Sequence, residues 1–279
     1  MAPPVNRMTG RAARLAPRWL TRLKREINQP ASRPRWPLEL RCHGRAAARI
    51  GSVEPMLAQQ MADAGLPLRA MGGVWCMAVS DPAAIDSTLS GFAQWLHAHG
   101  LAPAWRDERL AVTDAHGLAV AAIERAAVRP LGIASHAVHL MVSDERRAMW
   151  VQQRAFNKST DPGQWDTTVG GLVAAGESTL NALTRETWEE AGLRVAELRG
   201  LAPLGRLTVR RPVAEGYLVE HIALFEATAP AGLAPANQDG EVERFERLDT
   251  PALVERLHAG AFTSEAALIL ATWLMAKRQ

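Results

Sequence analysis

The sequence predicts a mixed α/β fold, and three observations lead to this prediction. Asp81 and Pro82 are a typical helix start, so residues 82–99 are expected to form a helix. The apolar runs 74–79 and 137–142 are expected to form strands. A chain of 279 residues, 48% of them hydrophobic, is also long enough for one large or two modest domains with their own cores.

The chain divides into three predicted parts. Residues 1–37 are expected to be a flexible basic arm, whose prolines at Pro30, Pro34 and Pro37 form a linker into the first folded unit. Residues 38–130 are expected to form a smaller α+β domain, with a helix over 52–65 and a hairpin around His116. Residues 131–279 are expected to form the larger domain, which contains the motifs described below.

The formal net charge of +3 conceals an asymmetry. Residues 1–37 contain nine basic side chains and one acidic side chain, whereas the rest has 23 basic and 28 acidic ones. Such an arm can bind nucleic acid or an acidic surface, or serve as a presequence. Only three residues of the chain are lysines, which points to a bias toward arginine rather than to a selected patch. We therefore expect a solvated tail and do not expect a nucleic-acid partner.

Composition argues against several classes of protein. Two cysteines, Cys42 and Cys76, are too few for a disulfide framework and indicate a reducing compartment. The sequence has no apolar run of membrane-spanning length and no secretory h-region, so we expect a cytoplasmic protein without membrane contact.

The most informative stretch is 165–193, WDTTVGGLVAAGESTLNALTRETWEEAGL. A strand is expected to lead into a glycine pair, and a helix is expected from Ser178 to Gly192. At about 100° per residue, Glu186, Glu189 and Glu190 lie within roughly 100° of arc on this helix. The opposite side, expected to pack on the sheet, contains the following residues: Leu180, Leu183, Thr184, Thr187, Trp188 and Ala191.

Three crowded carboxylates repel one another, and a single arginine, Arg185, does not neutralise them. A divalent cation such as Mg²⁺ or Mn²⁺, which prefers carboxylate oxygens and water, would do so. The alternative is an ordinary solvated helix face. The preceding glycine turn favours the metal, because exposed backbone there can approach a phosphate or bind the ion.

The fixed residues of this stretch match a known signature. They are Gly171, Glu177, Arg185, Glu186, Glu189, Glu190, Gly192 and Leu193. Their spacing resembles the Nudix box, Gly-x5-Glu-x7-Arg-Glu-U-x-Glu-Glu-x-Gly-U, where U is a bulky apolar residue. Thr187 alone departs from it, at a U position, which concerns packing rather than ligands.

The resemblance implies the Nudix fold, a mixed sheet between helices, and Mg²⁺- or Mn²⁺-dependent hydrolysis of a diphosphate linkage. It implies that Glu186, Glu189 and Glu190 bind the metal, with the carbonyl of Gly171 as a further ligand. It also implies that Arg185 orients Glu186 and that Glu177 supports the loop through Arg185, with Gly192 ending the helix. Metal ions would neutralise the diphosphate and lower the pKa of the attacking water, whose proton a carboxylate accepts.

A second acidic cluster, Asp239, Glu241 and Glu243, lies downstream. Nudix enzymes often supply a final ligand or general base from a loop in this region, and we expect Glu241 to act in this way. A solvent-facing turn is the alternative for Asp239 and Glu243.

Other stretches resemble one subfamily, the thiamin-pyrophosphokinase-related Nudix hydrolases. These stretches are WRDERLAV at 105–112, IERAAVRPLGIASHAVHL at 123–140 and QDGEVERF at 238–245. The resemblance implies that thiamin diphosphate, or its damaged or toxic analogues, is converted to a monophosphate. His139, Gln164 and Trp165 are candidates to line the substrate pocket, although such residues also serve as core.

Two other functions stay open from the sequence. The first is hydrolysis of a nucleoside diphosphate derivative, because the box is the same for both substrates. The second, a non-catalytic ligand-sensing Nudix protein, is disfavoured because every carboxylate of the box is present. KSTDPGQWD at 158–166 also resembles isopentenyl diphosphate isomerases, but those enzymes need a cysteine where this chain has Thr167 and Thr168. The apolar helix expected over 266–275 is too short to span a membrane and would serve as core or as a homodimer contact.

Overall fold

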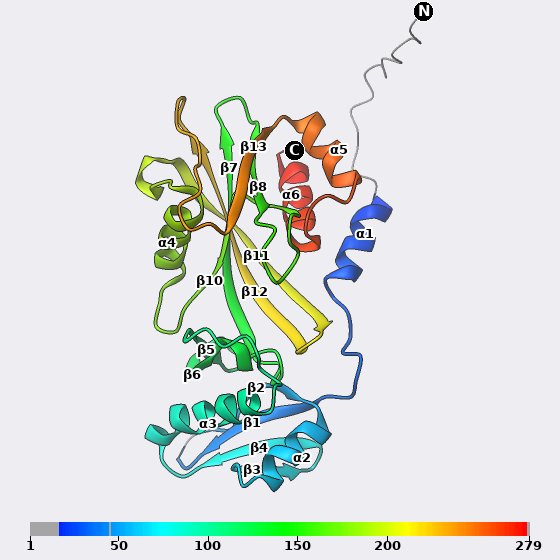
Figure 1. Cartoon of the computed structure of the whole chain (residues 1–279), viewed down its shortest axis with the longest axis vertical. Coiled ribbons are helices and arrows are strands. Elements are labelled where there is room, and N and C mark those ends of the chain that lie inside the picture. The colour runs from blue at the N-terminus through cyan, green and yellow to red at the C-terminus, as the bar shows by residue number, and fades with distance from the viewer. Residues whose placement is uncertain (1–16, 45, 278–279) are drawn as a thin grey trace, which may run out of the picture.

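The structure, a computed structural model, describes residues 17–44 and 46–277. Two sheet-containing bodies lie one above the other along the long axis of the molecule (Figure 1). The N-terminal body contains residues 36–133, and the C-terminal body contains residues 17–29 together with 134–277. The predicted fold class is confirmed, since a mixed sheet between helices follows a smaller α+β body.

The N-terminal body is built on a four-stranded sheet in the order β2-β1-β4-β3, in which β1 and β4 are parallel. Its strands are β1 (Trp36–Cys42), β2 (Ala48–Val53), β3 (Leu68–Met71) and β4 (Val74–Val79), and its helices are α2 (Pro55–Asp63) and α3 (Ile85–Ala98). The helix predicted over 52–65 begins later, because Ser52 and Val53 still pair with β1. The helix predicted over 82–99 has a 3₁₀ first turn, in which the Asp81 side chain accepts a hydrogen bond from the Ala83 amide.

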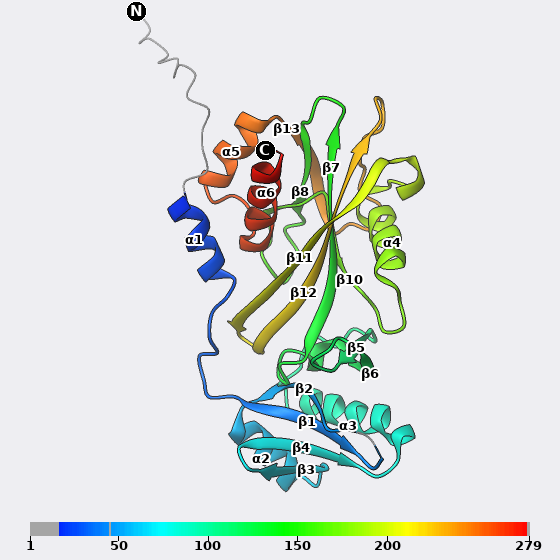
Figure 2. The ribbon, with the colours of Figure 1, turned by 180° about the vertical axis from the view of Figure 1, so that it is seen from behind.

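The predicted hairpin is present as β5 (Arg109–Thr113) and β6 (Ala119–Glu124), which pair antiparallel. It lies between the two larger sheets (Figure 2). Leu110, Val112 and Ile123 are buried in the same core as the four-stranded sheet. The hairpin therefore belongs to the N-terminal body, and it faces the C-terminal body.

The C-terminal body contains a seven-stranded mixed sheet. Its strands are β7 (Ala134–Asp144), β8 (Met149–Arg154), β9 (Trp165–Asp166), β10 (Val169–Leu172), β11 (Arg199–Val213), β12 (Gly216–Ala229) and β13 (Val242–Leu248). The order is β11-β12-β7-β8-β13, with β10 on β7 and β9 on β8. β7 and β12 are parallel, and the other pairs are antiparallel.

Helices cover both faces of this sheet. Helix α4 (Thr179–Ala191) packs on one face, and α5 (Thr250–His258) and α6 (Ser264–Ala276) pack on the other (Figure 1). Side chains alternate along β7, so Val138 and Leu140 face α4, whereas Ala137 and Met141 face α6. The side chains of α6 are buried on nearly all sides, so the predicted apolar helix is core.

The N-terminal segment differs from the predicted flexible arm. Residues Pro17–Glu26 form helix α1, which lies against α6, and Leu23 and Ile27 are buried in the core of the C-terminal body. The chain then pairs with β11, since Ile27 and Gln29 exchange backbone hydrogen bonds with Arg210. An apolar stripe beneath the arginines makes this packing possible, and it supplies the outer cover that α6 needs. Residues 1–16 of the predicted arm lie outside the described residues.

Short 3₁₀ turns cover Pro82–Ala84, Arg125–Ala127 and Val195–Glu197. Among the described residues, none of the helices has both the length and the apolar character needed to cross a membrane. Cys42 and Cys76 are both buried and unpaired with one another.

Candidate active site

Helix α4 begins and ends where the sequence predicts. The Ser178 hydroxyl accepts a hydrogen bond from the Asn181 amide at 3.1 Å, and Gly192 ends the helix with φ of 61°. A Cβ atom at Gly192 would lie 2.8 Å from the carbonyl oxygen of Ala236. Glycine is therefore needed both for the left-handed backbone and for the close approach of the loop that leads to β13.

The buried face of α4 differs from the predicted one. Leu180 and Trp188 were expected to pack on the sheet, but they are 56% and 47% exposed. The helix instead packs through Ala182, Leu183 and Thr187, an arc whose centre is occupied by Glu190. Thr187, the one departure from the box, is fully buried and donates its hydroxyl hydrogen bond to the carbonyl of Leu183.

Glu190 is a buried carboxylate with a defined orientation. It is 4% exposed, and its Oε2 accepts hydrogen bonds from the Gly170 amide at 2.8 Å and the Gln152 side-chain amide at 3.1 Å. Within the described chain, no donor reaches its other oxygen, Oε1. Burial raises the pKa of Glu190 to about 8, because the charged form is poorly solvated there. The free oxygen is therefore suited to a cation that would restore the charged form.

Glu186 lies beside the glycine pair of β10. A Cβ atom at Gly171 would collide with the Glu186 carboxyl group, so a larger residue at this position would displace that carboxyl group. Burial raises the pKa of Glu186 despite its contact with Arg185. On β10, Gly171 lies opposite Val138 of β7, and the Val173 amide donates to the carbonyl of His136 two residues further along. Hydrogen-bonded pairs recur every second residue in an antiparallel pair of strands, so the carbonyl of Gly171 points toward β7. Its predicted role as a metal ligand stays a prediction.

Arg185 is the centre of an ion-pair network. Its guanidinium donates to both oxygens of Glu177 at 3.0 and 2.9 Å, to Glu186 at 2.7 Å and to Glu189 at 3.0 Å. It also donates to the carbonyl of Leu172 at 3.0 Å. The hydrogen bonds from Arg185 lower the pKa of Glu177, which keeps that carboxylate charged. Arg185 thus contacts Glu186 and Glu177 as expected for the orienting and supporting roles predicted for them.

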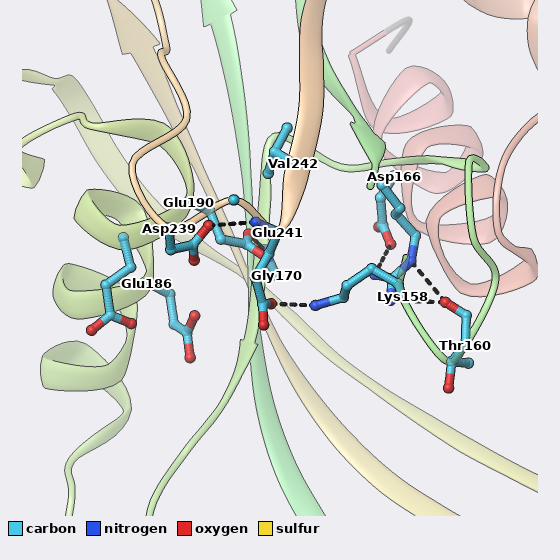
Figure 3. Close-up of polar contacts among 12 residues, drawn as sticks. Lys158, Thr160, Asp166, Gly170, Glu186, Glu190, Asp239, Glu241 and Val242 are labelled. Carbon is cyan, nitrogen blue, oxygen red and sulfur yellow. Dashed lines mark hydrogen bonds and ion pairs between the residues drawn. The ribbon is translucent and has the colours of Figure 1, made fainter. Parts of the chain in front are cut away.

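Glu241 precedes β13 and forms an ion pair with Lys158 (Figure 3). Burial alone would raise the pKa of Glu241, but the hydrogen bond and charge of Lys158 outweigh this and lower it. Glu241 also acts electrostatically on Glu186, which places the downstream carboxylate near the helix carboxylates. The structure therefore brings the two predicted acidic groups to one end of the sheet. Asp239 accepts a hydrogen bond from the Glu241 amide and so shapes the turn, whereas Glu243 is exposed on β13.

The loop 155–164 that carries Lys158 is held by Arg154. The Arg154 guanidinium donates to the carbonyl of Thr160 and lies 3.4 Å from Asp166. The backbone of Arg154 also bonds with Gly163 and Gln164 across the loop. Lys158 is therefore presented by a closed, hydrogen-bonded loop.

The three residues predicted to line a substrate pocket have different environments. His139 is on the α6 face of β7, where its Nδ1 is 2.8 Å from the hydroxyl of Thr167. Gln164 lines a small cavity of about 250 Å³ between α1, the loop 155–164 and α6. Trp165 is 7% exposed and packs in the core with Arg256 above its ring, so its position is mainly structural. The substrate roles of all three stay predictions.

A hard divalent cation fits this site. In the described part of the chain, no three acidic, histidine or cysteine side chains lie close enough together to hold a metal ion. Glu186 and Glu189 are both ion-paired with Arg185. The donor set is nevertheless composed of carboxylate oxygens, and Glu190 offers an oxygen without a donor. The space that glycine leaves at position 171 is filled by the Glu186 carboxyl group. These features suit Mg²⁺ or Mn²⁺ rather than a metal that prefers sulfur or nitrogen.

The C-terminal body is similar to known proteins. Residues 134–268 match the family profile described as the NUDIX domain. This part of the chain is therefore similar to Nudix domains. Over 150 residues, the chain is 30% identical to Nudix hydrolase 20, chloroplastic, of Arabidopsis thaliana, which covers 52% of this chain and 40% of that protein. It is also 32% identical over 129 residues to the isopentenyl-diphosphate Delta-isomerase of Streptomyces coelicolor, which covers 45% of this chain and 64% of the isomerase.

Among solved structures, the crystal structure of DR0079 from Deinococcus radiodurans has a TM-score of 0.48 and 24% identity to this chain. It covers 58% of this chain and 97% of the other. The chain spans less than two thirds of the plant and Streptomyces relatives.

Sequence reasoning missed three groups of the site. Gln152 lies on β8 outside the box, and the sequence MWVQQR of this strand does not distinguish it from Gln153. Lys158 was noted within a family stretch but without a role, although it is one of only three lysines. The Gly170 amide donates to Glu190 because β10 packs beside α4, a contact that the sequence does not show.

Proposed function

We propose that the Nudix domain catalyses the metal-dependent hydrolysis of a diphosphate linkage. The observation that carries this proposal is the buried carboxylate of Glu190, with one oxygen held by two donors and the other free, beside Glu186. Glu186, Glu189 and Glu190 would hold the Mg²⁺ or Mn²⁺ ion. When bound, the ion would neutralise the charge of the diphosphate and lower the pKa of the attacking water.

The protein's own residues would then divide the remaining work. Arg185 would keep Glu186 and Glu189 in position while the phosphate binds, because it contacts both side chains. The ammonium group of Lys158 would bind a phosphate oxygen, and the negative charge of the phosphate would compete with Glu241 for this cation. Glu241, once released from Lys158, would accept the proton of the attacking water.

For the substrate, we propose thiamin diphosphate or a damaged analogue, with the monophosphate as product. The support is the resemblance of residues 105–112, 123–140 and 238–245 to the thiamin-related Nudix subfamily. The first stretch leads into β5, the second runs from the end of β6 into β7, and the third contains Glu241. A nucleoside diphosphate derivative is the second candidate, because the metal site would serve it equally well.

Isomerisation is disfavoured by the residues that follow Trp165. Thr167 and Thr168 stand where the isomerases need a cysteine, and both are fully buried. Their hydroxyls donate to the carbonyls of Val169 and Trp150, so neither is free to exchange a proton with a substrate.

A substrate panel with matched metal conditions tests the proposal. Oxythiamin diphosphate, oxothiamin diphosphate, thiamin diphosphate, ADP-ribose and an oxidised nucleoside triphosphate would be incubated with Mg²⁺, Mn²⁺ or EDTA, and products separated by chromatography. We expect monophosphate formation from the thiamin group, dependent on metal and lost in Glu190→Gln. Preference for the nucleotides would replace the substrate assignment, and metal-independent or absent cleavage of every diphosphate would contradict the proposed chemistry.

A further inference from the structure

The loop between Gly171 and Glu177 is attached to the N-terminal body as well as to its own domain. Leu110 of β5 forms an antiparallel bridge with Ala174, and the Ala175 amide donates a hydrogen bond of 2.8 Å to the carbonyl of Arg109. The hairpin β5–β6 lies directly below this loop and β10 in both views (Figures 1 and 2). The N-terminal body thus adds one strand to the loop of the Nudix box.

Side-chain contacts on both sides of the loop strengthen this attachment. Leu172, which follows Gly171, packs against the cores of both bodies. Thr113 at the end of β5 places its hydroxyl 3.3 Å from Nε2 of His136 on β7. The bodies therefore meet through packed apolar and polar groups along the length of β5.

From this loop a continuous set of hydrogen bonds leads to the candidate metal ligands. The Ala174 amide donates to Oε2 of Glu177 at 3.1 Å, and Glu177 in turn accepts two hydrogen bonds from Arg185. Arg185 then contacts Glu186 and Glu189, as described above. Hydrogen bonds between neighbouring residues thus connect β5 to the two carboxylates.

We propose that β5 of the N-terminal body is a positioning element of the active site, which fixes the loop 173–177 and, through Glu177 and Arg185, the carboxylates that bind the metal. This role rests on the proposed metal site. It means that the N-terminal body contributes to the active site of the C-terminal body. Without the pairing, the loop would be a free connection between β10 and α4, and Arg185 would lose the fixed partner that holds it.

One substitution removes this pairing with little other change. Ala174 to Glu177 form a turn, since the Glu177 amide donates to the carbonyl of Ala174 and Gly176 has φ of +80°. Proline is favoured at the second position of such a turn, so Ala175→Pro preserves the turn but deletes the donor to Arg109. Ala115 occupies the second position of the turn 114–117 in the β5–β6 hairpin, where its amide has no described acceptor. Ala115→Pro is therefore the matched control.

The test measures Mg²⁺ binding by calorimetry in the full-length protein. We expect Ala175→Pro to raise the Kd for Mg²⁺ about fivefold or more, the effect of one lost hydrogen bond of about 1 kcal/mol, whereas Ala115→Pro leaves it unchanged. In a Glu177→Gln background, Ala175→Pro should add nothing, because the connection is already broken. Equal Kd values for the two proline variants, or independent effects of Ala175→Pro and Glu177→Gln, would overturn the proposal.

A metal-free measurement separates this proposal from the proposed function. Hydrogen exchange should be faster at residues 173–187 in Ala175→Pro than in Ala115→Pro, with EDTA present throughout. Unchanged exchange in this segment would overturn the role of β5 whether or not the protein binds metal. Failure of the wild-type protein to bind Mg²⁺ would instead contradict the proposed function, and the exchange result would still decide the role of β5.

Discussion

Replacing Glu190 by glutamine should change how the stability of the metal-free protein depends on pH. The Glu190 carboxyl has a pKa of about 8 in the folded protein against an ordinary value of 4.5, because it is buried. The folded state therefore holds this proton more tightly than the unfolded state. Its stabilising effect is complete below pH 4.5 and is lost as the pH rises toward 8.

The magnitude follows from the size of the shift. One pKa unit corresponds to about 1.4 kcal/mol, so the shift from 4.5 to about 8 amounts to about 5 kcal/mol of unfolding free energy across this pH range. Glutamine has nearly the same shape and does not ionise. As the pH rises toward 8, the unfolding free energy of the wild-type protein should therefore fall, whereas that of the Glu190→Gln variant should not show this loss.

Urea denaturation at pH 5, 6, 7 and 8 in EDTA measures this difference. We expect the wild-type protein to lose several kcal/mol relative to Glu190→Gln between pH 5 and pH 8. Glu189→Gln is the matched control on the same helix, because the Glu189 side chain is 43% exposed rather than buried. Parallel stability curves for the wild-type protein and Glu190→Gln would refute the buried placement of this carboxyl group. Addition of Mg²⁺ at pH 8 should stabilise the wild-type protein and not Glu190→Gln.

Substitutions at three further positions test single contacts of the site. Gly171→Ala should weaken Mg²⁺ binding at least tenfold, on the order of 1.4 kcal/mol, because its Cβ would displace the Glu186 carboxyl group; unchanged calorimetric affinity would contradict this. Gln152→Leu removes a donor that orients Glu190 and should weaken Mg²⁺ binding by about 1 kcal/mol. Gln152→Glu places a second carboxylate beside Glu190 and should lower the unfolding free energy at neutral pH in urea titrations. Lys158→Met should raise the KM for the diphosphate about tenfold in steady-state kinetics, with Lys158→Arg retaining part of the affinity; an unchanged KM would exclude a phosphate contact.

The N-terminal helix shows how composition can obscure a local signal. Nine basic residues among the first 37 dominated the prediction of a flexible arm. Leu23 and Ile27 nevertheless have the spacing of one helix face, and this face packs on α6. The charged side of a short helix does not show whether its other side is apolar. The apolar side stabilises the helix only when a partner such as α6 covers it.

The sequence by itself determined the local features of the site. The start and end of α4 and the row of Glu186, Glu189 and Glu190 follow from helix geometry and from a motif contained in 23 residues. These features depend on neighbours along the chain, and one helical turn is enough to place them.

Only the tertiary structure decided which carboxylate is buried and what holds it. Periodicity assigned Leu180 and Trp188 to the buried face, whereas the docking of α4 turned Glu190 inward, because Gly170 and Gln152 supply donors there. The contacts of Lys158 with Glu241 and of β5 with Ala174 join segments about 65 to 85 residues apart. Such pairings depend on how the sheets and helices pack, and no pattern of neighbouring residues encodes them.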